Sequence, residues 1–344
     1  MGFSANAFPW YGRRWRSIIF PNVWSISEIL KLPKNYNEGL ANWLALFSFL
    51  CKMEHKAGYV NIIGNPNVGK STLMNALIGQ KLSIITHKAQ TTRHRILGIL
   101  NEKEYQIVFS DTPGVIEPAY KLQESMMNFV HSAFQDADVL IYMIEVGEKG
   151  LKDQKLFERL KKTSVPVLML LNKIDLAEQD FVAQEMERWG AELPNAELLP
   201  ISALNNFNLD KIKTKIVEML PVSPPYYDKD AITDKSERFF IEEIIREKIL
   251  KHYKKEIPYS VQIEVEEFFE EEEIIKIRAI IYVLRESQKG IIIGHKGMGL
   301  KRIGSEARRD IEKMLDKKVF LATPVKVKKN WRNDNRQLKK FGYE

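Results

Sequence analysis

The segment Gly64-Asn-Pro-Asn-Val-Gly-Lys-Ser71 constrains the fold of this chain more than any other feature. It matches the pattern G-x-x-x-x-G-K-[ST] and lies between an apolar run, residues 59–63, and a helical pattern, residues 70–78. In such a strand–loop–helix unit the backbone N–H groups point at phosphate oxygens. Lys70 supplies a charge for the β- and γ-phosphates, and the Ser71 hydroxyl is a ligand for Mg²⁺. The first domain is therefore expected to bind a nucleoside phosphate.

Apolar and helical segments alternate from Tyr59 to Leu220. Strands are predicted at 59–63, 96–100, 105–111, 139–145, 167–172 and 198–201, and helices at 70–78, 122–134, 151–161, 181–188 and 209–220. This alternation predicts an α/β fold with a mostly parallel sheet and helices on both faces. Such sheets bind ligands at the carboxyl ends of their strands.

Further segments follow predicted strands at that edge. The carboxylate of Asp111-Thr-Pro-Gly114 can hold Mg²⁺ through water, and the Gly114 N–H can meet a γ-phosphate. In Asn172-Lys-Ile-Asp175 the aspartate can accept both N1–H and the exocyclic amino group of guanine, a donor pair that adenine lacks. Ser202-Ala203 lets the backbone approach the base carbonyl, and a threonine of Gln90-Thr-Thr-Arg93 can reach Mg²⁺ when γ-phosphate is present. These segments predict a guanine nucleotide site.

The predicted activity is that of a Mg²⁺-dependent GTPase that forms GDP and phosphate. In Ras-like GTPases a glutamine just after the DxxG segment orients the attacking water, but Val115 cannot hydrogen-bond a water. Intrinsic hydrolysis should therefore be slow unless another group compensates. The predicted nucleotide-binding residues are Gly64, Asn65, Pro66, Asn67, Val68, Gly69, Lys70, Ser71, Thr72, Asp111, Thr112, Pro113, Gly114, Val115, Asn172, Lys173, Ile174, Asp175, Ser202 and Ala203.

A second domain follows the proline-rich segment Pro221–Asp228, which stops helices and is predicted as a linker. The order α-β-β-α-β is predicted from residue 236 to residue 327, which gives a small α+β domain. Within it, Gly290-Ile-Ile-Ile-Gly294-His-Lys-Gly297 ends in G-x-x-G, a loop that clamps about four nucleotides in KH modules. The predicted RNA-binding residues are Gly294, His295, Lys296, Gly297, Lys301 and Arg302, and Ile291, Ile292, Ile293 and Ile303 are predicted to floor the base groove.

The basic charge of the chain is concentrated at its C-terminus. The net charge is +7, and Lys317–Glu344 contains nine Lys and Arg against two acidic residues. In contrast, Glu264–Glu273 holds seven glutamates, which we interpret as a solvated hairpin. The division predicts an electrostatic face for nucleic acid and adds Lys326, Lys328 and Lys329 to the RNA-binding set. A solvated basic tail without a ligand is the alternative.

From about residue 53 to residue 344 the motifs occur in a fixed order: GNPNVGKST, QTTRHR, DTPG, NKID and SAL, followed by PPYY and GIIIG-x-x-G. In these motifs and their order the chain resembles the Era-like family of bacterial GTPases. The resemblance implies a GTPase domain at 53–220, a linker at 221–235, a type II KH domain at 236–330 and a basic tail at 331–344. It also implies a role in maturation of the 30S ribosomal subunit, with the KH domain bound near the 3′ end of the small-subunit ribosomal RNA. A cytoplasmic location, peripheral contact with the inner membrane and the absence of a stable oligomer complete this expectation.

The resemblance also implies roles for single residues. Thr92 is expected to bind Mg²⁺ together with Ser71 and Asp111, with Thr91 as the alternative to Thr92. Asn67 is expected to help hold K⁺ against the phosphates, as in some GTPases with the loop G-x-P-N-x-G-K-[ST], or else to satisfy only the loop backbone. Lys70, Thr92 and Asn67 are therefore the catalytic candidates.

Residues 1–52 do not share the pattern of the rest. They contain four of the six tryptophans, few acidic residues and Cys51, the single cysteine, which excludes a disulfide framework. No apolar run reaches the roughly 18 residues of a spanning helix. Three interpretations stay open: an atypical extension without function ahead of a natural start at Met53, an organellar targeting segment, or a membrane-contacting arm. The last two correspond to a mitochondrial Era-like ribosome assembly GTPase and to a membrane-associated signalling GTPase.

Overall fold

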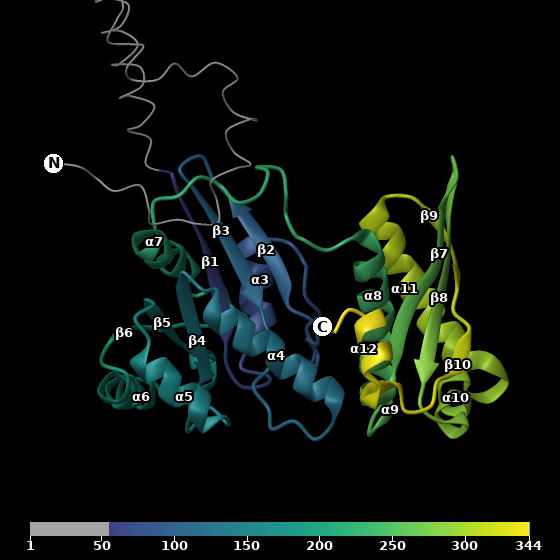
Figure 1. The fold of residues 1–344 in the computed structure, drawn as a ribbon, viewed down its shortest axis with the longest axis horizontal. Helices are drawn as coiled ribbons and strands as arrows, with labels where there is room; N and C mark the ends of the chain where they lie inside the picture. Colours follow the sequence, from purple (N-terminus) through teal and green to yellow (C-terminus); the bar gives the residue numbers. More distant parts are fainter. Residues whose placement is uncertain (1–54, 344) are drawn as a thin grey trace, which may run out of the picture. The chain divides into compact units, whose positions relative to one another are not determined.

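The computed structural model describes residues 55–343, and the predicted extension at 1–52 lies outside these residues. The first part of the described chain forms a six-stranded sheet in the order β2-β3-β1-β4-β5-β6 (Figure 1). β2 pairs antiparallel with β3, and the other neighbouring strands of this sheet are parallel. The strands are β1 (Lys56–Ile63), β2 (Ile96–Asn101), β3 (Tyr105–Asp111), β4 (Val139–Glu145), β5 (Val167–Asn172) and β6 (Ala196–Pro200).

Helices cover both faces of this sheet, because its central strands are apolar on both sides. α3 and α7 share one core cluster with alternate strand residues such as Ile62 and Ile141. α4, α5 and α6 share another cluster with the intervening residues, such as Ile63 and Leu140. The helices are α3 (Lys70–Ile78), α4 (Lys121–Gln135), α5 (Gln154–Lys162), α6 (Gln179–Glu192) and α7 (Leu209–Met219).

The segment predicted as a linker is extended but is bound to this sheet. The Gln106 side chain accepts from the backbone N–H groups of Tyr226 and Tyr227 at 2.7 and 3.0 Å and donates to the Tyr227 carbonyl at 2.8 Å. Farther along, the Ile99 N–H donates to the Ile232 carbonyl at 2.8 Å. These bonds hold parts of the segment 221–235 against the edge strand β2 and its neighbour β3.

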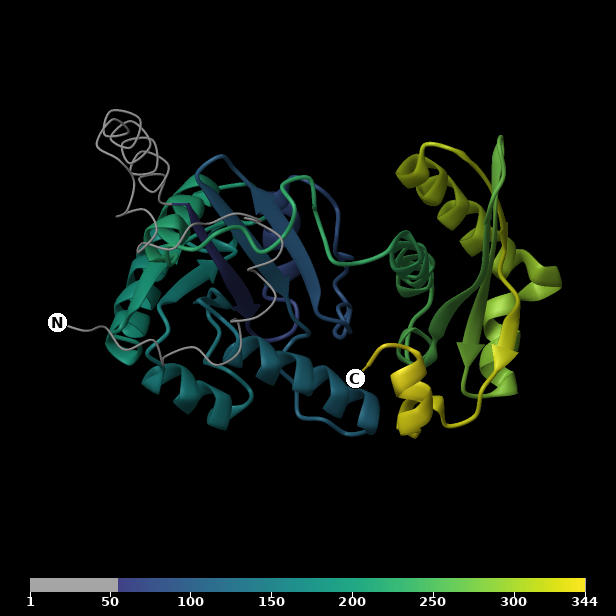
Figure 2. The ribbon, with the colours of Figure 1, turned by 45° about the horizontal axis from the view of Figure 1, so that its top comes forward.

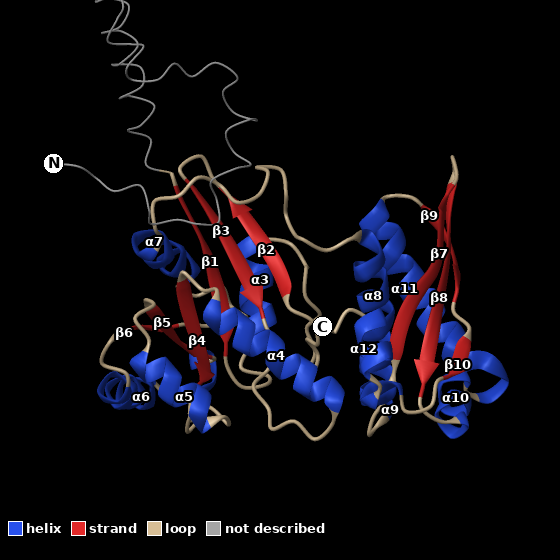
Figure 3. Ribbon diagram, in the orientation of Figure 1, coloured by secondary structure: helices blue, strands red, loops and turns tan. Residues whose placement is uncertain are grey.

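The rest of the described chain is an α+β unit that follows the predicted order α-β-β-α-β, with the short helix α9 added after α8 and the predicted second helical stretch divided into α10 and α11 (Figures 2 and 3). Helices α8, α10 and α11 pack on one face of a small sheet through residues such as Ile245, Ile281 and Ile311. The acidic run forms the β7–β8 hairpin, as predicted. The elements are α8 (Glu237–His252), α9 (Ile257–Ser260), β7 (Gln262–Glu270), β8 (Ile274–Val283), α10 (Glu286–Ile293), α11 (Met298–Leu315), β9 (Lys318–Ala322) and β10 (Val325–Val327).

The last predicted strand, residues 318–327, is divided into two short strands. β9 and β10 both pair in parallel with β8, at Ile274–Arg278 and at Ile281–Val283 respectively. Pro324 lies between them and has no N–H for a ladder, although its carbonyl accepts from the Ile281 N–H at 2.9 Å. A single continuous strand was therefore the wrong prediction.

The segment predicted as a basic tail, residues 331–344, is folded where it is described. It forms η4 (Trp331–Asn333) and α12 (Asn335–Lys340), and Trp331, Leu338 and Tyr343 are buried. They share a core cluster with Ile280 and Tyr282 of β8 and with Leu122 and Met126 of α4. The prediction of a tail was wrong because the aromatic residues between the cations supply a core.

Cations from each domain bond to main-chain carbonyls of the other. Arg93 is buried and donates to the carbonyls of Val261 at 2.8 Å and Pro258 at 2.9 Å. Arg246 of α8 donates to the Thr91 carbonyl at 2.5 Å. The Lys88 ammonium donates to carbonyls at the C-terminal end of α8, where the helix dipole favours a cation. The loop that carries Thr91 and Thr92 is thus fastened to the second domain.

Candidate functional site

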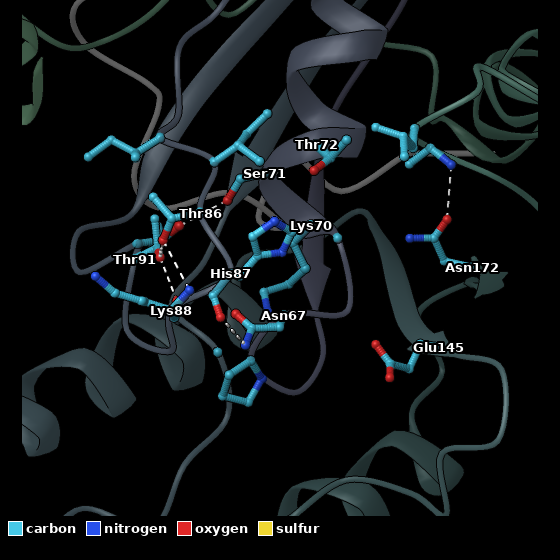
Figure 4. Close-up of a pocket in the computed structure, with 18 of the residues that line it drawn as sticks. Asn67, Lys70, Ser71, Thr72, Thr86, His87, Lys88, Thr91, Glu145 and Asn172 are labelled. Carbon is cyan, nitrogen blue, oxygen red and sulfur yellow. Dashed lines mark hydrogen bonds between the residues drawn. The ribbon is translucent and has the colours of Figure 1, made fainter. Parts of the chain in front are cut away.

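A cavity of about 880 Å³ lies at the carboxyl ends of β1, β3 and β5, a volume in the range of small-molecule sites. Its wall includes Lys70, Ser71 and Thr72 of the loop–helix junction and Asn172 of β5, whose arrangement Figure 4 shows. The other predicted nucleotide-binding residues in the wall are Pro66, Asn67, Gly69, Thr112, Gly114, Lys173, Asp175 and Ala203. The structure therefore gathers four separate sequence motifs around one space.

The backbone of the loop is held open by neighbouring strand ends. Gly69 has φ +107, and a Cβ there would collide with the Asn172 side chain, so a glycine is required. Asn172 donates to the Val68 carbonyl at 2.7 Å and accepts from the Ala203 N–H at 2.9 Å. One asparagine thus fixes the phosphate loop and the Ser202-Ala203 segment relative to each other.

Lys70 points into the hollow of the loop. Its ammonium donates to the carbonyls of Gly64 at 3.0 Å and Asn65 at 2.8 Å. Burial lowers the pKa of Lys70 to about 8, although Asp111 and Glu148 act in the opposite direction. A cation that is costly to bury and has only carbonyls as partners is well suited to phosphate oxygens.

Three oxygen-bearing side chains meet at the start of α3. The Ser71 hydroxyl donates to Asp111 at 2.7 Å, and the Thr92 hydroxyl lies 2.9 Å from that of Ser71 and 3.2 Å from Asp111. Thr91 instead bonds to Thr86 at 2.7 Å and to the Lys88 carbonyl at 2.6 Å. This geometry supports Thr92 over Thr91 as the switch threonine.

The same cluster has the chemistry of a Mg²⁺ site. The second carboxylate oxygen of Asp111 is buried and has no hydrogen-bond partner among the described residues. Burial raises the pKa of Asp111, while the Ser71 hydroxyl and Lys70 lower it. Hydroxyl and carboxylate oxygens are ligands that Mg²⁺ prefers, and one carboxylate is sufficient when phosphates supply the rest. Residues 55–343 contain no cluster of three or more His, Cys, Asp or Glu that could hold a metal ion.

The other end of the cavity carries the predicted base-recognition residues. Asp175 lies exposed in the wall, and Lys173 before it has a left-handed backbone and pairs with Glu145. Leu176 and Leu204 flank this end with 77% and 76% of their surface exposed. An apolar rim beside a carboxylate suits a flat heterocycle with N–H donors.

Some predicted site residues turn away from the cavity. The Asn65 side chain donates to Glu148 and to the Gly150 carbonyl, so it secures the loop after β4. Val68 and Val115 are buried in the two cores of the domain. Any nucleotide contact of these residues has to come from their backbones. Five more of the predicted residues do not line the cavity: Gly64, Asp111, Pro113, Ile174 and Ser202.

A second group of wall residues was not predicted from the sequence. The segment Ile84–Lys88 covers one side of the cavity, and Asn67 donates to the His87 carbonyl at 3.1 Å (Figure 4). Leu250 and Lys251 of α8 also contribute to the wall. The position of 84–88 just before Gln90-Thr-Thr-Arg93 was an available signal. No local signal points to α8, because it reaches the cavity only through the packing of the two domains.

The G-x-x-G loop joins α10 to α11 through η3 (His295–Gly297). Gly294 and Gly297 have φ of +70 and +78, and Gly297 is the residue that precedes α11. His295, Lys296, Lys301 and Arg302 are exposed around this turn. Backbone N–H groups and cations at the start of an 18-residue helix form a favourable place for a phosphate.

The predicted floor of the base groove needs correction. Ile292 and Ile303 are fully buried and belong to the core of the domain. Ile291 and Met298 are instead 48% and 60% exposed beside the loop. The helical period places only one side of α10 at the surface, so a run of isoleucines cannot all face a ligand.

The C-terminal cations are largely engaged within the second domain. Lys326 lies 3.9 Å from Glu266, Lys317 3.1 Å from Glu270 and Lys340 2.6 Å from Glu264. The Lys328 ammonium lies 4.8 Å from the ring centre of Tyr282, and burial lowers its pKa. The charge division seen in the sequence is thus partly cancelled by folding. The exposed Lys296 and Lys301 are the clearer RNA candidates, while Arg302 lies 3.3 Å from Glu306.

None of the described helices is both long and apolar enough to cross a membrane.

Comparison with known proteins gives concordant matches. Residues 59–173 match a family model described as "50S ribosome-binding GTPase", and residues 256–332 match one described as "KH domain". The chain is 43% identical to the GTPase Era of Staphylococcus haemolyticus over 292 residues, which is 84% of this chain and 98% of that relative. It is 45% identical to the GTPase Era of a Thermoanaerobacter species over 294 residues, 85% of this chain and 97% of that relative.

Two solved structures agree with these matches. One is Era in complex with MgGDPNP and nucleotides 1506–1542 of 16S ribosomal RNA, and the other is an Aquifex aeolicus Era variant bound to GDP and AlF4⁻. Each superposes with a TM-score of 0.81 at 38% identity and covers 84% of this chain and 99% of its own. The expected fold, a GTPase domain followed by a KH domain, is confirmed.

Proposed function

The chain belongs to the Era family of GTPases, and we propose that it couples hydrolysis of GTP to binding of small-subunit ribosomal RNA near its 3′ end during maturation of the 30S subunit. The observation that carries the proposal is that residues of four nucleotide-binding motifs line one cavity, in the same chain as a G-x-x-G loop with exposed cations. The intact Lys70 and Asp175 argue against a degenerate nucleotide site.

In the proposed complex the phosphates occupy the hollow around Lys70. The ammonium exchanges its two carbonyl partners for β- and γ-phosphate oxygens, and the N–H groups of the loop and of α3 surround the β-phosphate. Ser71, Thr92 and, through water, Asp111 would hold Mg²⁺, and the bound ion would neutralise charge on the phosphates. The shared hydrogen bonds of these three side chains already bring their oxygens to one point.

Guanine is the base that the other end of the cavity selects. Asp175 accepts N1–H and the exocyclic amino group, while Asn172 keeps the Ala203 N–H and the phosphate loop in register with it. Adenine leaves the carboxylate without donors in a partly apolar site, which costs binding energy.

We assign a second cation, K⁺, to the region of Asn67. The Asn67 side chain is exposed at the cavity wall, and its amide nitrogen bonds to the His87 carbonyl, so its oxygen can face a cation beside the phosphates. A monovalent cation there would stabilise charge that develops at the leaving oxygen. The alternative is that Asn67 serves only to hold residues 84–88.

RNA is proposed to bind across the G-x-x-G loop. Gly294 and Gly297 allow close approach of the RNA backbone, Lys296, Lys301 and Arg302 neutralise phosphates, and Ile291 and Met298 contact bases. Lys326 and Lys328 contribute to this set only as far as RNA competes with their internal partners, Glu266 and the Tyr282 ring. Lys329 is exposed and joins them in the proposed set.

The proposal is tested by separating the two activities. The full chain is titrated with GTP and with a synthetic RNA that carries the 3′ end of 16S ribosomal RNA, against an RNA of the same composition in scrambled order. We expect Lys70→Ala to lose GTP binding and keep RNA binding, and Gly297→Asp to do the reverse. Gly190→Asp, which adds the same charge where a Cβ meets nothing within 4 Å, should leave RNA binding unchanged. Equal affinity for the two RNAs would contradict the proposed target.

The cellular setting belongs to the same proposal. We expect the protein to sediment with the 30S precursor in the cytoplasm and to act without forming a stable oligomer. Peripheral contact with the inner membrane would be detected as binding to vesicles of anionic phospholipid. Sedimentation with membranes but not with ribosomal particles would favour a membrane-associated signalling GTPase instead.

A further inference from the structure

Val115 is in no position to act on a water molecule. Its side chain is fully buried in the core cluster that contains Met127 and Tyr142, and its N–H donates to the Gly64 carbonyl at 3.1 Å. In Ras-type GTPases a glutamine side chain orients the attacking water at this point of the site. A residue of this chain that orients the water must therefore be another polar side chain of the cavity wall.

Most polar side chains on the adjoining wall are already engaged. The hydroxyls of Thr86 and Thr91 bond to each other at 2.7 Å. The Lys88 ammonium donates to carbonyls at the end of α8. Thr92 belongs to the Mg²⁺ cluster with Ser71. His87 and Gln90 are the remaining wall residues of this segment that can bond a water.

Gln90 is the better placed of these two. It is half-buried and lines the same cavity as Thr92 and Gly114, the groups expected at Mg²⁺ and at the γ-phosphate, whereas His87 is exposed. Its backbone has φ +60, an uncommon conformation for a glutamine that tends to occur at functional positions. The backbone is therefore locally strained at Gln90.

Tyr120 fixes the orientation of the Gln90 amide. The Tyr120 hydroxyl donates to the Gln90 side-chain oxygen at 3.1 Å from the residue that precedes α4. The Arg332 guanidinium lies 4.4 Å from the centre of the Tyr120 ring, and the Lys121 N–H donates to Asn333 at 3.3 Å. An amide oxygen has two lone pairs, so Gln90 can accept from Tyr120 and from a water at once while its NH₂ group donates to a γ-phosphate oxygen.

We propose that Gln90 orients the attacking water in GTP hydrolysis and that Tyr120 is its positioning residue. The water oxygen forms a bond to the γ-phosphorus while the bond from that phosphorus to the β–γ bridging oxygen breaks, and the bond's electron pair stays on GDP. The water protons end on the released phosphate, and the amide takes none. Gln90 acts by holding the water in line, which removes the entropic cost of finding that geometry.

The test compares single-turnover hydrolysis with nucleotide binding in the full chain. For Gln90→Ala we expect the hydrolysis rate constant to fall by about 100-fold, the low end for loss of one transition-state group, with the dissociation constant of GDP changed less than about twofold. Binding of GDP with aluminium fluoride should weaken in parallel, a readout that a structural role would not move. Tyr120→Phe should lower the rate by about tenfold, because the amide is retained but is free to rotate. Glu117→Ala, an exposed change in the same loop, is the matched control.

Three outcomes would overturn the proposal. A decrease of less than about tenfold for Gln90→Ala would show that the amide does not act on the water. A loss confined to His87→Ala would assign the task to that residue. An equal loss of GDP affinity in Gln90→Ala would mean that Gln90 shapes the cavity instead. The proposal rests on the nucleotide site described above, and failure of the parent chain to bind GTP would contradict that site rather than Gln90.

Discussion

Replacement of Asp175 by asparagine is expected to convert the preference for guanine into a preference for xanthine. The substitution keeps the size of the side chain but replaces one carboxylate oxygen by an NH₂ donor. That donor faces the exocyclic amino group of guanine, whereas in xanthine it faces a carbonyl oxygen. Asp175 is exposed and has no hydrogen bond to another described residue, so the folded state should lose nothing.

The magnitude follows from the hydrogen bonds at stake. Each bond from a base N–H to a carboxylate is worth about 1.5–3 kcal/mol, and the asparagine replaces one of two by a contact between donors. A loss of about 3 kcal/mol corresponds to a GTP affinity roughly 150-fold weaker. XTP recovers both bonds, so its affinity should rise by a similar factor.

The assay is a calorimetric titration of the parent, Asp175→Asn and Asp180→Asn with GTP and XTP. Asp180 is also exposed, on α6, and provides the same change of charge away from the cavity. Thermal unfolding of the three proteins should coincide. An unchanged GTP affinity in Asp175→Asn would refute the assignment of the base site, and an equal loss in Asp180→Asn would show that net charge is responsible.

Four further outcomes are expected. Gly297→Asp should weaken RNA binding while GTP binding persists. It causes less steric conflict than Gly294→Asp, because a Cβ at 297 meets nothing within 4 Å. Retained RNA affinity at moderate salt would exclude the G-x-x-G loop as the RNA-binding site. Val115→Ala should lower the free energy of unfolding by about 2 kcal/mol, because the fully buried side chain loses two methyl groups. It should change the hydrolysis rate little, and a slower rate in the folded variant would contradict this. Hydrolysis should be faster in K⁺ than in Na⁺ at equal ionic strength, with the difference lost in Asn67→Ala; equal rates in both salts would remove the K⁺ assignment. Because burial lowers the pKa of Lys70 to about 8, GTP affinity should fall as the pH rises through that value, and a flat profile from pH 7 to 9 would show that Lys70 keeps its proton over this range and would contradict the lowered pKa.

Elements with a local signal were predicted well. β3, β4, β5 and α3 have the predicted bounds. Their strands are apolar runs that end at a polar motif, and α3 is bracketed by Gly69 and Gly79. In each case the residues that define the boundary adjoin the element, so sequence alone contains the information.

The failures concern interactions between distant segments. The pairing of Lys326 with Glu266 and the burial of Trp331 are invisible in a charge count, which treats the C-terminus as a solvated tail. Deleting the chain from Lys326 onward would therefore remove part of the core rather than only phosphate contacts. Likewise, the contribution of Lys251 to the cavity wall depends on packing between domains, and periodicity within α8 does not report it.

The contacts between the two domains restrict sequence change at the donor residues more than at the acceptor residues. Lys88, Arg93 and Arg246 each donate to main-chain carbonyls, and one of these acceptors belongs to a proline, Pro258. A carbonyl is present whatever side chain stands at its position, so the accepting residues can drift without loss of the bond. The donors have no such freedom, because even arginine-to-lysine exchange changes the geometry of the contact. Mutational tolerance at this junction should therefore be high on the acceptor side and low at three cations.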